Sequence, residues 1–281
     1  SSFHRVVELC QRPYRVKPVT VSLGNSAIVL ALPHGGTFVP DDIAQKLNEN
    51  GLKLADTDWH IDRLYADLLP DVTTVAATFH RYVIDANRDP MGESLYPGLN
   101  TTTLVPLTDF DGLSIWDTPP TLAEIDQRRT AYHTLYHSTL AGELARVRDL
   151  HGFAILYDCH SIRSDIPFLF DGTLPDFNIG TNLSTTCAIE VEISVLDICT
   201  GALDYTSAIN ARFKGGWTTR HYGQPGSGIH AIQMELSQST YLSEEAAPWI
   251  YDQDKATSLR PHLSFILTTL ADLKLSLGDP R

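Results

Sequence analysis

The sequence predicts an α/β fold in which a mixed, largely parallel central sheet carries helices on both of its faces. Residues 27–32 are apolar throughout, residues 153–158 are mostly apolar, and both runs have the length of strands. This pattern is typical of strands that helices bury on both sides. Segments of strand and helix character also alternate along the chain. Because the composition nowhere shifts enough to mark a boundary, we expect a single domain over residues 1–281.

Short strands and helices are expected through most of the chain. Residues 19–23 and 27–32 are predicted as strands on either side of a Gly-Asn turn. Pro40 is predicted to begin a short helix, and residues 56–69 carry apolar side chains close to the helical period. Four further runs have strand character: 72–78, 81–86, 216–221 and 230–236.

The longest irregular segment and the longest helix are expected to follow one another. Residues 87–120 are rich in Gly, Pro, Thr and Asp, and loops of this length inside a domain usually have a function. Residues 121–150 form the strongest helical pattern, with Gly152 as its stop signal. Residues 252–277 predict a closing helix that is interrupted or kinked near Pro261.

Charge and composition exclude several classes of function. The 21 Lys and Arg residues against 34 Asp and Glu residues give a net charge of −13, which argues against a nucleic-acid partner. No apolar run approaches the roughly 18 residues that a membrane helix needs. The four cysteines show no paired metal spacing, and a reduced, cytoplasmic setting is expected. No pattern indicates an oligomeric state. A small anionic substrate would require Arg side chains gathered locally.

Two of the buried strands are each followed by a histidine, and these predict a metal site. His34 and His160 come after residues 27–32 and 153–158, and sites in α/β sheets form beyond the carboxyl ends of strands. Two imidazoles and a carboxylate suit zinc and leave a position open for water, although iron or manganese could also bind. The acidic cluster at 56–62 offers the third ligand, and we favour Asp58. Asp158 lies two residues before His160, on the same strand face, where it can orient the imidazole.

Other histidines and acids are given structural interpretations. The two strand-end histidines could themselves be merely hydrogen-bonded near the core. His133 and His137 lie one turn apart on the predicted long helix, but the glutamate of a metalloprotease motif is absent, so a partly solvated helix face is expected. Glu190 and Glu192 are expected on the surface face of a strand.

A lone acid and several arginines add candidates for catalysis and binding. Glu235 lies in a mostly apolar strand, where a carboxylate is costly unless it has a partner or a role. It is either a general base or one half of an ion pair with an Arg. Arg81, Arg88 and Arg163 lie close in sequence to the predicted site strands, and a guanidinium recognises carboxylates through paired hydrogen bonds. Each of them could instead form a surface salt bridge.

Five motifs, taken in order, resemble those of the N-formylglutamate amidohydrolase family. They are Pro33-His34-Gly35-Gly36, Asp56-Thr57-Asp58-Trp59-His60-Ile61, Arg81-Tyr82-Val83-Ile84-Asp85-Ala86-Asn87-Arg88, Asp158-Cys159-His160-Ser161 and His230-Ala231-Ile232-Gln233-Met234-Glu235-Leu236. The resemblance extends from about residue 27 to residue 241. It implies hydrolysis of N-formyl-L-glutamate to formate and L-glutamate, the last step of one route of histidine breakdown, and a fold similar to that of the zinc carboxypeptidases.

The resemblance also implies roles for individual residues. His34 and His160 match the metal histidines, Glu235 the base, and the pair Asn87-Arg88 the group that binds a carboxylate. In the carboxypeptidase pattern the acidic ligand follows the first histidine by three positions, but Thr37 stands there in this chain. The assignment of Asp58 therefore rests on its acidic cluster.

The hypothesis that follows is a metallohydrolase in which a divalent ion activates water. Glu235 accepts the proton from that water and passes it to the leaving amine, while Arg81 stabilises the oxyanion. Arg88 with Asn87, and also Arg163, would hold the two carboxylates of the substrate. Two alternatives stay open: a deacylase or carboxypeptidase for another N-acyl amino acid, and a non-catalytic protein that binds a small anion.

Overall fold

A computed structural model of the protein describes residues 16–275. Its centre is a seven-stranded sheet in the order β1-β3-β2-β4-β7-β5-β6. The strands are β1 (Val19–Ser22), β2 (Ile28–Leu32), β3 (Thr73–Ala77), β4 (Ala154–Ile162), β5 (Phe177–Gly180), β6 (Ser207–Ile209) and β7 (Ile229–Ser237). The four central strands β3, β2, β4 and β7 are parallel. Antiparallel pairing begins only where β1 joins β3 and where β5 joins β7. The sheet is therefore mixed and largely parallel, as predicted.

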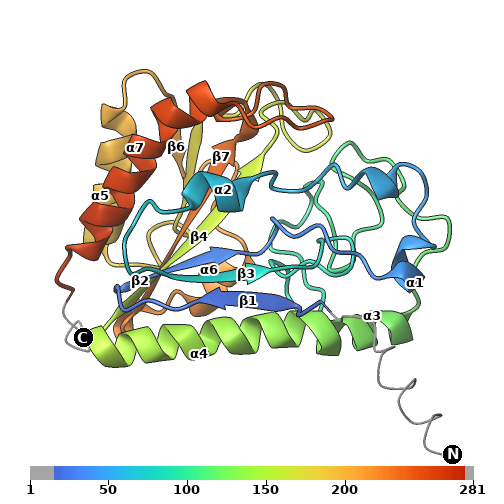
Figure 1. Cartoon of the computed structure of the whole chain (residues 1–281), viewed down its shortest axis with the longest axis horizontal. Coiled ribbons are helices and arrows are strands. Elements are labelled where there is room, and N and C mark those ends of the chain that lie inside the picture. Colours follow the sequence, from blue (N-terminus) through green and yellow to red (C-terminus); the bar gives the residue numbers. More distant parts are fainter. Residues whose placement is uncertain (1–15, 276–281) are drawn as a thin grey trace, which may run out of the picture.

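Helices cover both faces of this sheet, which confirms the predicted fold class (Figure 1). The long helix α4 (Thr134–His151) and the short α6 (Trp217–Tyr222) pack on one face. The helices α2 (Ile61–Tyr65), α5 (Ile189–Gly201) and α7 (Gln253–Ala271) cover the other. Successive residues of β2 enter the two cores alternately, because side chains along a strand point to opposite faces.

The two apolar runs are buried over their whole length, which explains their lack of polar alternation. All five residues of β2 and all nine residues of β4 are buried. β4 extends further than predicted, because it continues to Ile162. Cys159, His160 and Ser161 are consequently strand residues rather than part of a loop after the strand. Cys159, Cys187 and Cys199 are free and buried, whereas Cys10 lies outside the described residues.

The predicted long helix has three parts. It begins with α3 (Leu122–Arg128), where Thr121 and Glu124 form a reciprocal capping box. A π-helical segment, Arg129–His133, then leads into α4. Gly152 ends the helix in the left-handed region at φ 80°, as predicted for a glycine stop.

Two segments predicted as strands have other structures. Residues 81–86 form buried turns, and residues 217–222 are the helix α6. Residues 81–86 are buried, and residues 217–222 are rich in Thr and aromatic side chains. Neither feature alone distinguishes a strand from a turn or a helix. The helix predicted at 56–69 is limited to α2. β1 pairs with β3 rather than with β2, so the Gly-Asn turn does not close a hairpin.

The short helix α1 (Asp41–Ala44) was predicted. The remaining differences lie in the C-terminal half, where the strands β5 and β6 and the helix α5 were not predicted. Glu192 is buried on α5, where its carboxylate accepts hydrogen bonds from Thr181 and Ser184, so its assignment to a strand surface is wrong. Pro261 lies inside α7 without ending it. Across residues 16–275, no helix is both long enough and apolar enough to cross a membrane.

Candidate active site

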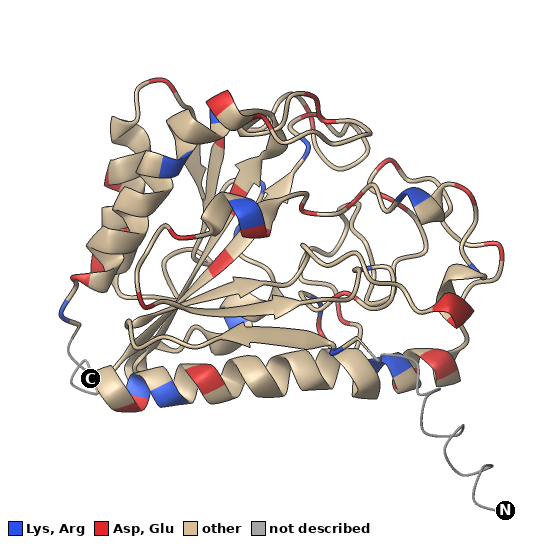
Figure 2. Cartoon of the chain, in the orientation of Figure 1, with Lys and Arg blue, Asp and Glu red and all other residues tan. Residues whose placement is uncertain are grey.

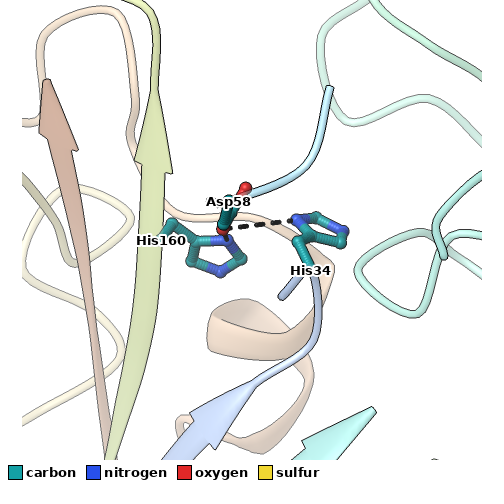
Figure 3. Close-up of side chains that lie close together, drawn as sticks. All are labelled: His34, Asp58 and His160. Atoms are coloured by element: carbon teal, nitrogen blue, oxygen red, sulfur yellow. Dashed lines mark ion pairs between the residues drawn. The ribbon is translucent and has the colours of Figure 1, made fainter. Parts of the chain in front are cut away.

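The predicted metal ligands come together at the carboxyl edge of the parallel strands (Figure 3). His34 follows β2, His160 lies near the end of the neighbouring β4, and Asp58 lies in the loop before α2. One ligand atom from each of the three lies within 4.8 Å of the others. The side chain of Asp58 lies between the two imidazoles: its Oδ2 is 3.4 Å from His160 Nδ1 and 4.0 Å from His34 Nδ1. The prediction that these three residues meet is confirmed.

Backbone hydrogen bonds fix the loop that carries Asp58. The Asp58 amide donates to the carbonyl of His34 over 3.0 Å, which ties the acidic loop to the end of β2. The Ser161 amide of β4 donates to Asp58 Oδ2 over 3.2 Å. All three members of the cluster are at most 3 % exposed. The arrangement is therefore built by the ends of two strands and one loop, and solvent does not separate its members.

The outer nitrogen of each imidazole contacts a carboxylate. His34 Nε2 lies 2.6 Å from Asp85 Oδ1 in a hydrogen bond. His160 Nε2 lies 2.8 Å from Asp158 Oδ2, an ion-pair distance at an angle outside that of a hydrogen bond. Asp158 thus lies where the strand spacing predicted. Although burial opposes a charged ring, Asp158 and Asp58 raise the pKa of His160 well above its usual value.

These contacts fit a divalent cation. His34 Nε2 is hydrogen-bonded to a carboxylate, which leaves a lone pair on Nδ1 of the neutral ring. The Nδ1 atoms of both imidazoles face Asp58. Four buried carboxylates surround this point: those of Asp58, Asp85, Asp158 and Glu235. Neither oxygen of Asp158 has a partner in hydrogen-bond geometry. Two imidazole nitrogens, a carboxylate oxygen and a surplus of buried negative charge are the donor set and the field that suit zinc.

Glu235 faces the same cavity from β7. It is the direct neighbour of His160 in the parallel register of β4 and β7, so the two side chains lie on the same face of the sheet. Burial raises the pKa of Glu235 to about 8. Within residues 16–275 no Arg or Lys forms an ion pair with it, which disfavours the structural alternative considered for this residue. A carboxyl group whose pKa lies near neutrality, beside a candidate metal cluster, is suited to proton transfer.

Arg81 lines the cavity, and a buried ion pair with Asp85 holds its side chain there. Its Nη2 donates to Asp85 Oδ2 over 2.7 Å, and its guanidinium lies 4.8 Å from the centre of the Phe110 ring. Asp85 was not predicted as a site residue, although it stands within the motif that contains Arg81 and Arg88. Its signal in the sequence was a lone acid in an otherwise apolar stretch. Burial opposes its ionisation, yet Arg81, His34 and Arg88 hold the pKa of Asp85 well below its usual range.

Asn87 and Arg88 line the cavity next to Arg81. The amide of Asn87 donates to Asp85 Oδ1 over 2.8 Å, and the side-chain Oδ1 of Asn87 accepts from the amide of Thr218 over 3.0 Å. Arg88 donates from Nε and Nη2 to the carbonyl and the hydroxyl of Thr102. A Cβ on Gly216 would lie 2.4 Å from Asn87 Nδ2, so a residue without a side chain is needed there. Both predicted binding residues are held in fixed positions at the cavity wall.

The third predicted binding residue lies elsewhere. Arg163 pairs with Asp111 over 3.0 Å and does not line the cavity. Arg212, which the sequence analysis did not single out, does line it. It comes from the segment between β6 and α6, and nothing in its local sequence distinguishes it from a surface arginine.

His133 and His137 are buried, so the prediction of a partly solvated helix face is wrong. His133 Nε2 lies 3.0 Å from the carbonyl of Arg88, and His137 Nε2 lies 2.6 Å from that of Ala86. Burial lowers the pKa of His137 to about 3. Both rings therefore stay neutral at physiological pH and can donate to the backbone on either side of Asn87. The π-helical segment ends at His133, and such segments often occur at functional sites.

The cavity has the lining of a small-molecule site, with several polar and charged groups converging on one space. Seven of the nine predicted site residues line it: His34, Asp58, Arg81, Asn87, Arg88, His160 and Glu235. Tyr96, Thr101, Thr102 and Phe110 of the long irregular segment complete the wall. The fold and the cavity together define an α/β protein with a buried His–Asp–His group that could hold a metal ion, next to a buried glutamate.

Comparison with known proteins assigns the chain to a family. The N-formylglutamate amidohydrolase family matches residues 26–242. N-formylglutamate deformylases from Pseudomonas aeruginosa and Pseudomonas putida are each 41 % identical, over 88 % and 90 % of this chain and 93 % and 96 % of their own. The crystal structure of N-formylglutamate amidohydrolase from Ralstonia eutropha JMP134 is similar with a TM-score of 0.76 at 26 % identity, and covers 92 % of this chain and 98 % of its own. The chain belongs to the N-formylglutamate amidohydrolase family, as its motifs predict, and is a hydrolase of amide bonds.

Proposed function

We propose that this protein hydrolyses N-formyl-L-glutamate to formate and L-glutamate, as a step of histidine degradation in the cytoplasm. The observation that carries the proposal is a single cavity in which a His–Asp–His cluster, a buried glutamate and three arginines meet. The names of the two Pseudomonas relatives support the substrate. The arginines supply the positive charge that a small dianion requires in a chain of net charge −13.

We infer that His34, Asp58 and His160 hold one divalent cation, with zinc the favoured ion. Both histidines present Nδ1 toward the cluster, and carboxylates contact their outer nitrogens. Such an ion supplies two things when bound: it lowers the pKa of water, and it polarises a carbonyl oxygen. His34 and His160 are suited to bind it because burial keeps competing solvent away from them.

The side chains around the cluster have separate roles in this proposal. The carboxylate of Glu235 accepts a proton as water attacks the formyl carbon, and returns it to the amine of the departing glutamate. Arg81 donates a hydrogen bond to the oxygen that becomes negative in the tetrahedral intermediate. Asp85 keeps the guanidinium of Arg81 in place. Asn87 and Arg88 bind the α-carboxylate, and Asp158 orients His160.

A substrate comparison tests this function. Purified protein with its metal content measured is given N-formyl-, N-acetyl- and N-succinyl-L-glutamate, and release of the acid is followed. We expect formate release at a kcat/KM at least about 10-fold above that of the larger acyl groups, because an extra group in a closed pocket discriminates by that order. Faster release of acetate or succinate would assign the chain to another N-acyl amino acid. No hydrolysis of any of the three by protein with bound metal would leave only anion binding.

A further inference from the structure

We propose that Arg212 binds the side-chain carboxylate of the substrate and makes the enzyme selective for N-acyl amino acids with an acidic side chain. This inference rests on the proposed function and assigns its second carboxylate to a residue. N-formyl-L-glutamate carries two carboxylates, whereas Asn87 and Arg88 form only one binding group. Arg163, the other predicted candidate, lies outside the cavity and is already paired with Asp111.

Arg212 lies in the wall of the catalytic cavity. It lines the same space as His160 and Glu235, together with Leu169 and Phe213 of its surroundings. The centre of the Phe213 ring lies 5.1 Å from the guanidinium, and a charge-assisted hydrogen bond is stronger beside apolar groups than in water. Burial lowers the pKa of Arg212, and the carboxylate of Glu235 acts on it in the opposite direction. The guanidinium is thus within electrostatic range of the reacting groups.

The charge of Arg212 is not matched by a carboxylate of the protein. Its Nε donates to the carbonyl of Leu169 over 3.2 Å, and its Nη2 to the carbonyl of Asn100 over 3.4 Å. These bonds hold the side chain but do not neutralise it, and they leave Nη1 available. Within residues 16–275 no Asp or Glu forms an ion pair with Arg212, in contrast to Arg81 and Arg163. A half-buried cation without a counter-charge is unfavourable unless an anion binds there.

Arg88 is less available for the second carboxylate. Its Nε, Nη1 and Nη2 all donate to Thr102 or to the carbonyl of Asn87. Its Nη1 also lies 3.7 Å from the buried carboxylate of Asp85. These contacts fix Arg88 next to Asn87 in the cavity wall. We therefore assign the α-carboxylate of the substrate to Asn87 and Arg88. Arg212 belongs to a different segment of the wall, so the two guanidinium groups can hold two separate carboxylates.

Tyr96 gives Arg212 a rigid support. The Tyr96 hydroxyl donates to the carbonyl of Gly215 over 3.1 Å and accepts from the amide of Lys214 over 3.3 Å. Its ring centre lies 5.5 Å from the Arg212 guanidinium and 5.2 Å from that of Arg220. Arg220 does not line the cavity. The substitution Arg220→Gln is therefore a matched control, because it removes the same charge beside the same ring from a residue that does not line the cavity.

The test compares an acidic substrate with its neutral isostere. We measure kcat/KM for N-formyl-L-glutamate and N-formyl-L-glutamine with the wild type, Arg212→Gln, Arg212→Lys and Arg220→Gln. The wild type is expected to prefer the glutamate derivative by about 10²-fold or more, because the neutral amide leaves the half-buried guanidinium without its counter-charge. In Arg212→Gln the ratio of the two kcat/KM values, glutamate derivative over glutamine derivative, falls to within about threefold of one. Arg212→Lys retains an intermediate ratio, because an ammonium keeps the charge but not the paired hydrogen bonds. Arg220→Gln retains the wild-type ratio.

Two results separate this inference from the proposed function. If the wild type releases formate from N-formyl-L-glutamate but Arg212→Gln keeps the same preference, Arg212 does not bind the side chain, and the proposed function still holds. If metal-loaded wild type hydrolyses neither compound, the proposed function is wrong and the inference falls with it. Because the readout is a ratio within one protein sample, partial misfolding of a variant does not alter it, and circular dichroism confirms that each variant folds.

Discussion

Asp85 is the single residue on which three parts of the site depend. One oxygen of its carboxylate contacts His34 and the amide of Asn87, and the other accepts from Arg81. The candidate metal cluster, the proposed oxyanion donor Arg81 and the proposed carboxylate-binding residue Asn87 are therefore all in contact with one side chain that is fully buried. A carboxylate in this position also balances the charge of Arg81, which is 5 % exposed.

Replacing Asp85 should lower stability more than replacing an acid in an exposed pair. We expect Asp85→Asn to reduce the free energy of unfolding by about 3–5 kcal/mol, since it leaves Arg81 buried without its partner. The matched control is Asp111→Asn, which breaks the more exposed pair with Arg163 and should change stability by at most about 1 kcal/mol. Urea denaturation measures both. Equal losses of unfolding free energy in the two variants would show that Asp85 contributes no more to stability than an acid in an exposed pair.

The effect of Asp85→Asn should depend on pH in a defined direction. The folded protein holds the pKa of Asp85 well below its usual range, so folding favours the ionised form. The stability that Asp85 contributes is complete above its unfolded pKa of about 4. It is lost as the pH falls from there through the lower folded pKa. The difference in unfolding free energy between wild type and variant should therefore be constant from pH 5 upward and narrow in acid. A difference that widens in acid would contradict this.

Glu235 should be required for turnover but not for folding. We expect Glu235→Gln to lower kcat by about 10²–10⁴-fold, the range for loss of a general base, while metal content stays at the wild-type level. Because burial raises the pKa of Glu235 to about 8, its ionisation opposes folding, and the neutral amide should not lower stability at pH 9. Formate release, elemental analysis and thermal unfolding measure the three quantities. Turnover equal to that of the wild type would remove Glu235 from the mechanism.

The helical element behind the cavity supports the backbone on either side of Asn87, a proposed substrate-binding residue. His133, at the end of the π-helical segment, and His137, one turn later on α4, contact the carbonyls on either side of Asn87. A continuous α-helix with solvated histidines was predicted from the residue pattern, because periodicity does not show which loop packs on a helix. The burial of this helix face follows from residues 81–86, which pass over it as turns rather than as a strand.

Loss of the His133 contact should affect binding more than chemistry. We expect His133→Ala to raise KM for N-formyl-L-glutamate about fivefold, the value of one hydrogen bond of about 1 kcal/mol, with a smaller change in kcat. His133→Gln restores a donor and should recover most of the loss. His151→Ala is the control, because that histidine lies on the same helix and contacts the carbonyl of Asn25 at the surface. A change confined to kcat would indicate another role.

At the scale of whole elements, prediction succeeded where burial on two faces leaves a distinctive pattern. The run that became β2 is apolar at every position, and β4 and β7 are apolar except for a few polar side chains, among them Asp158, His160 and Glu235. Prediction failed for β5, β6 and α5, whose short or mixed segments carry no such pattern. Residues 217–222 resemble a strand in composition, but they form α6, which packs on β4 and β7.

For the molecule as a whole, the site unites segments that are distant in sequence. The ends of β2, β4 and β7 meet because parallel strands bring their carboxyl ends to one edge, so His34, His160 and Glu235 could be predicted from their strands. Arg212 could not, because no strand or motif leads to it and only tertiary packing brings it to the cavity. In Figure 2, Lys and Arg positions are scattered among Asp and Glu positions. The three arginines of the cavity therefore form a local exception within an acidic chain.

The stability of the whole protein should depend on a bound cation. Four buried carboxylates converge near His34 and His160, so a cation that binds only the folded state shifts the unfolding equilibrium toward it. Protein dialysed against a chelator should gain about 4 kcal/mol when zinc is added at 1,000 times its dissociation constant, and its melting temperature should rise with zinc concentration. His160→Ala removes a ligand and should abolish this rise, whereas His151→Ala, far along α4, should retain it. If zinc leaves the melting temperature of the dialysed wild type unchanged while formate release continues, the reaction does not use a metal held by this cluster.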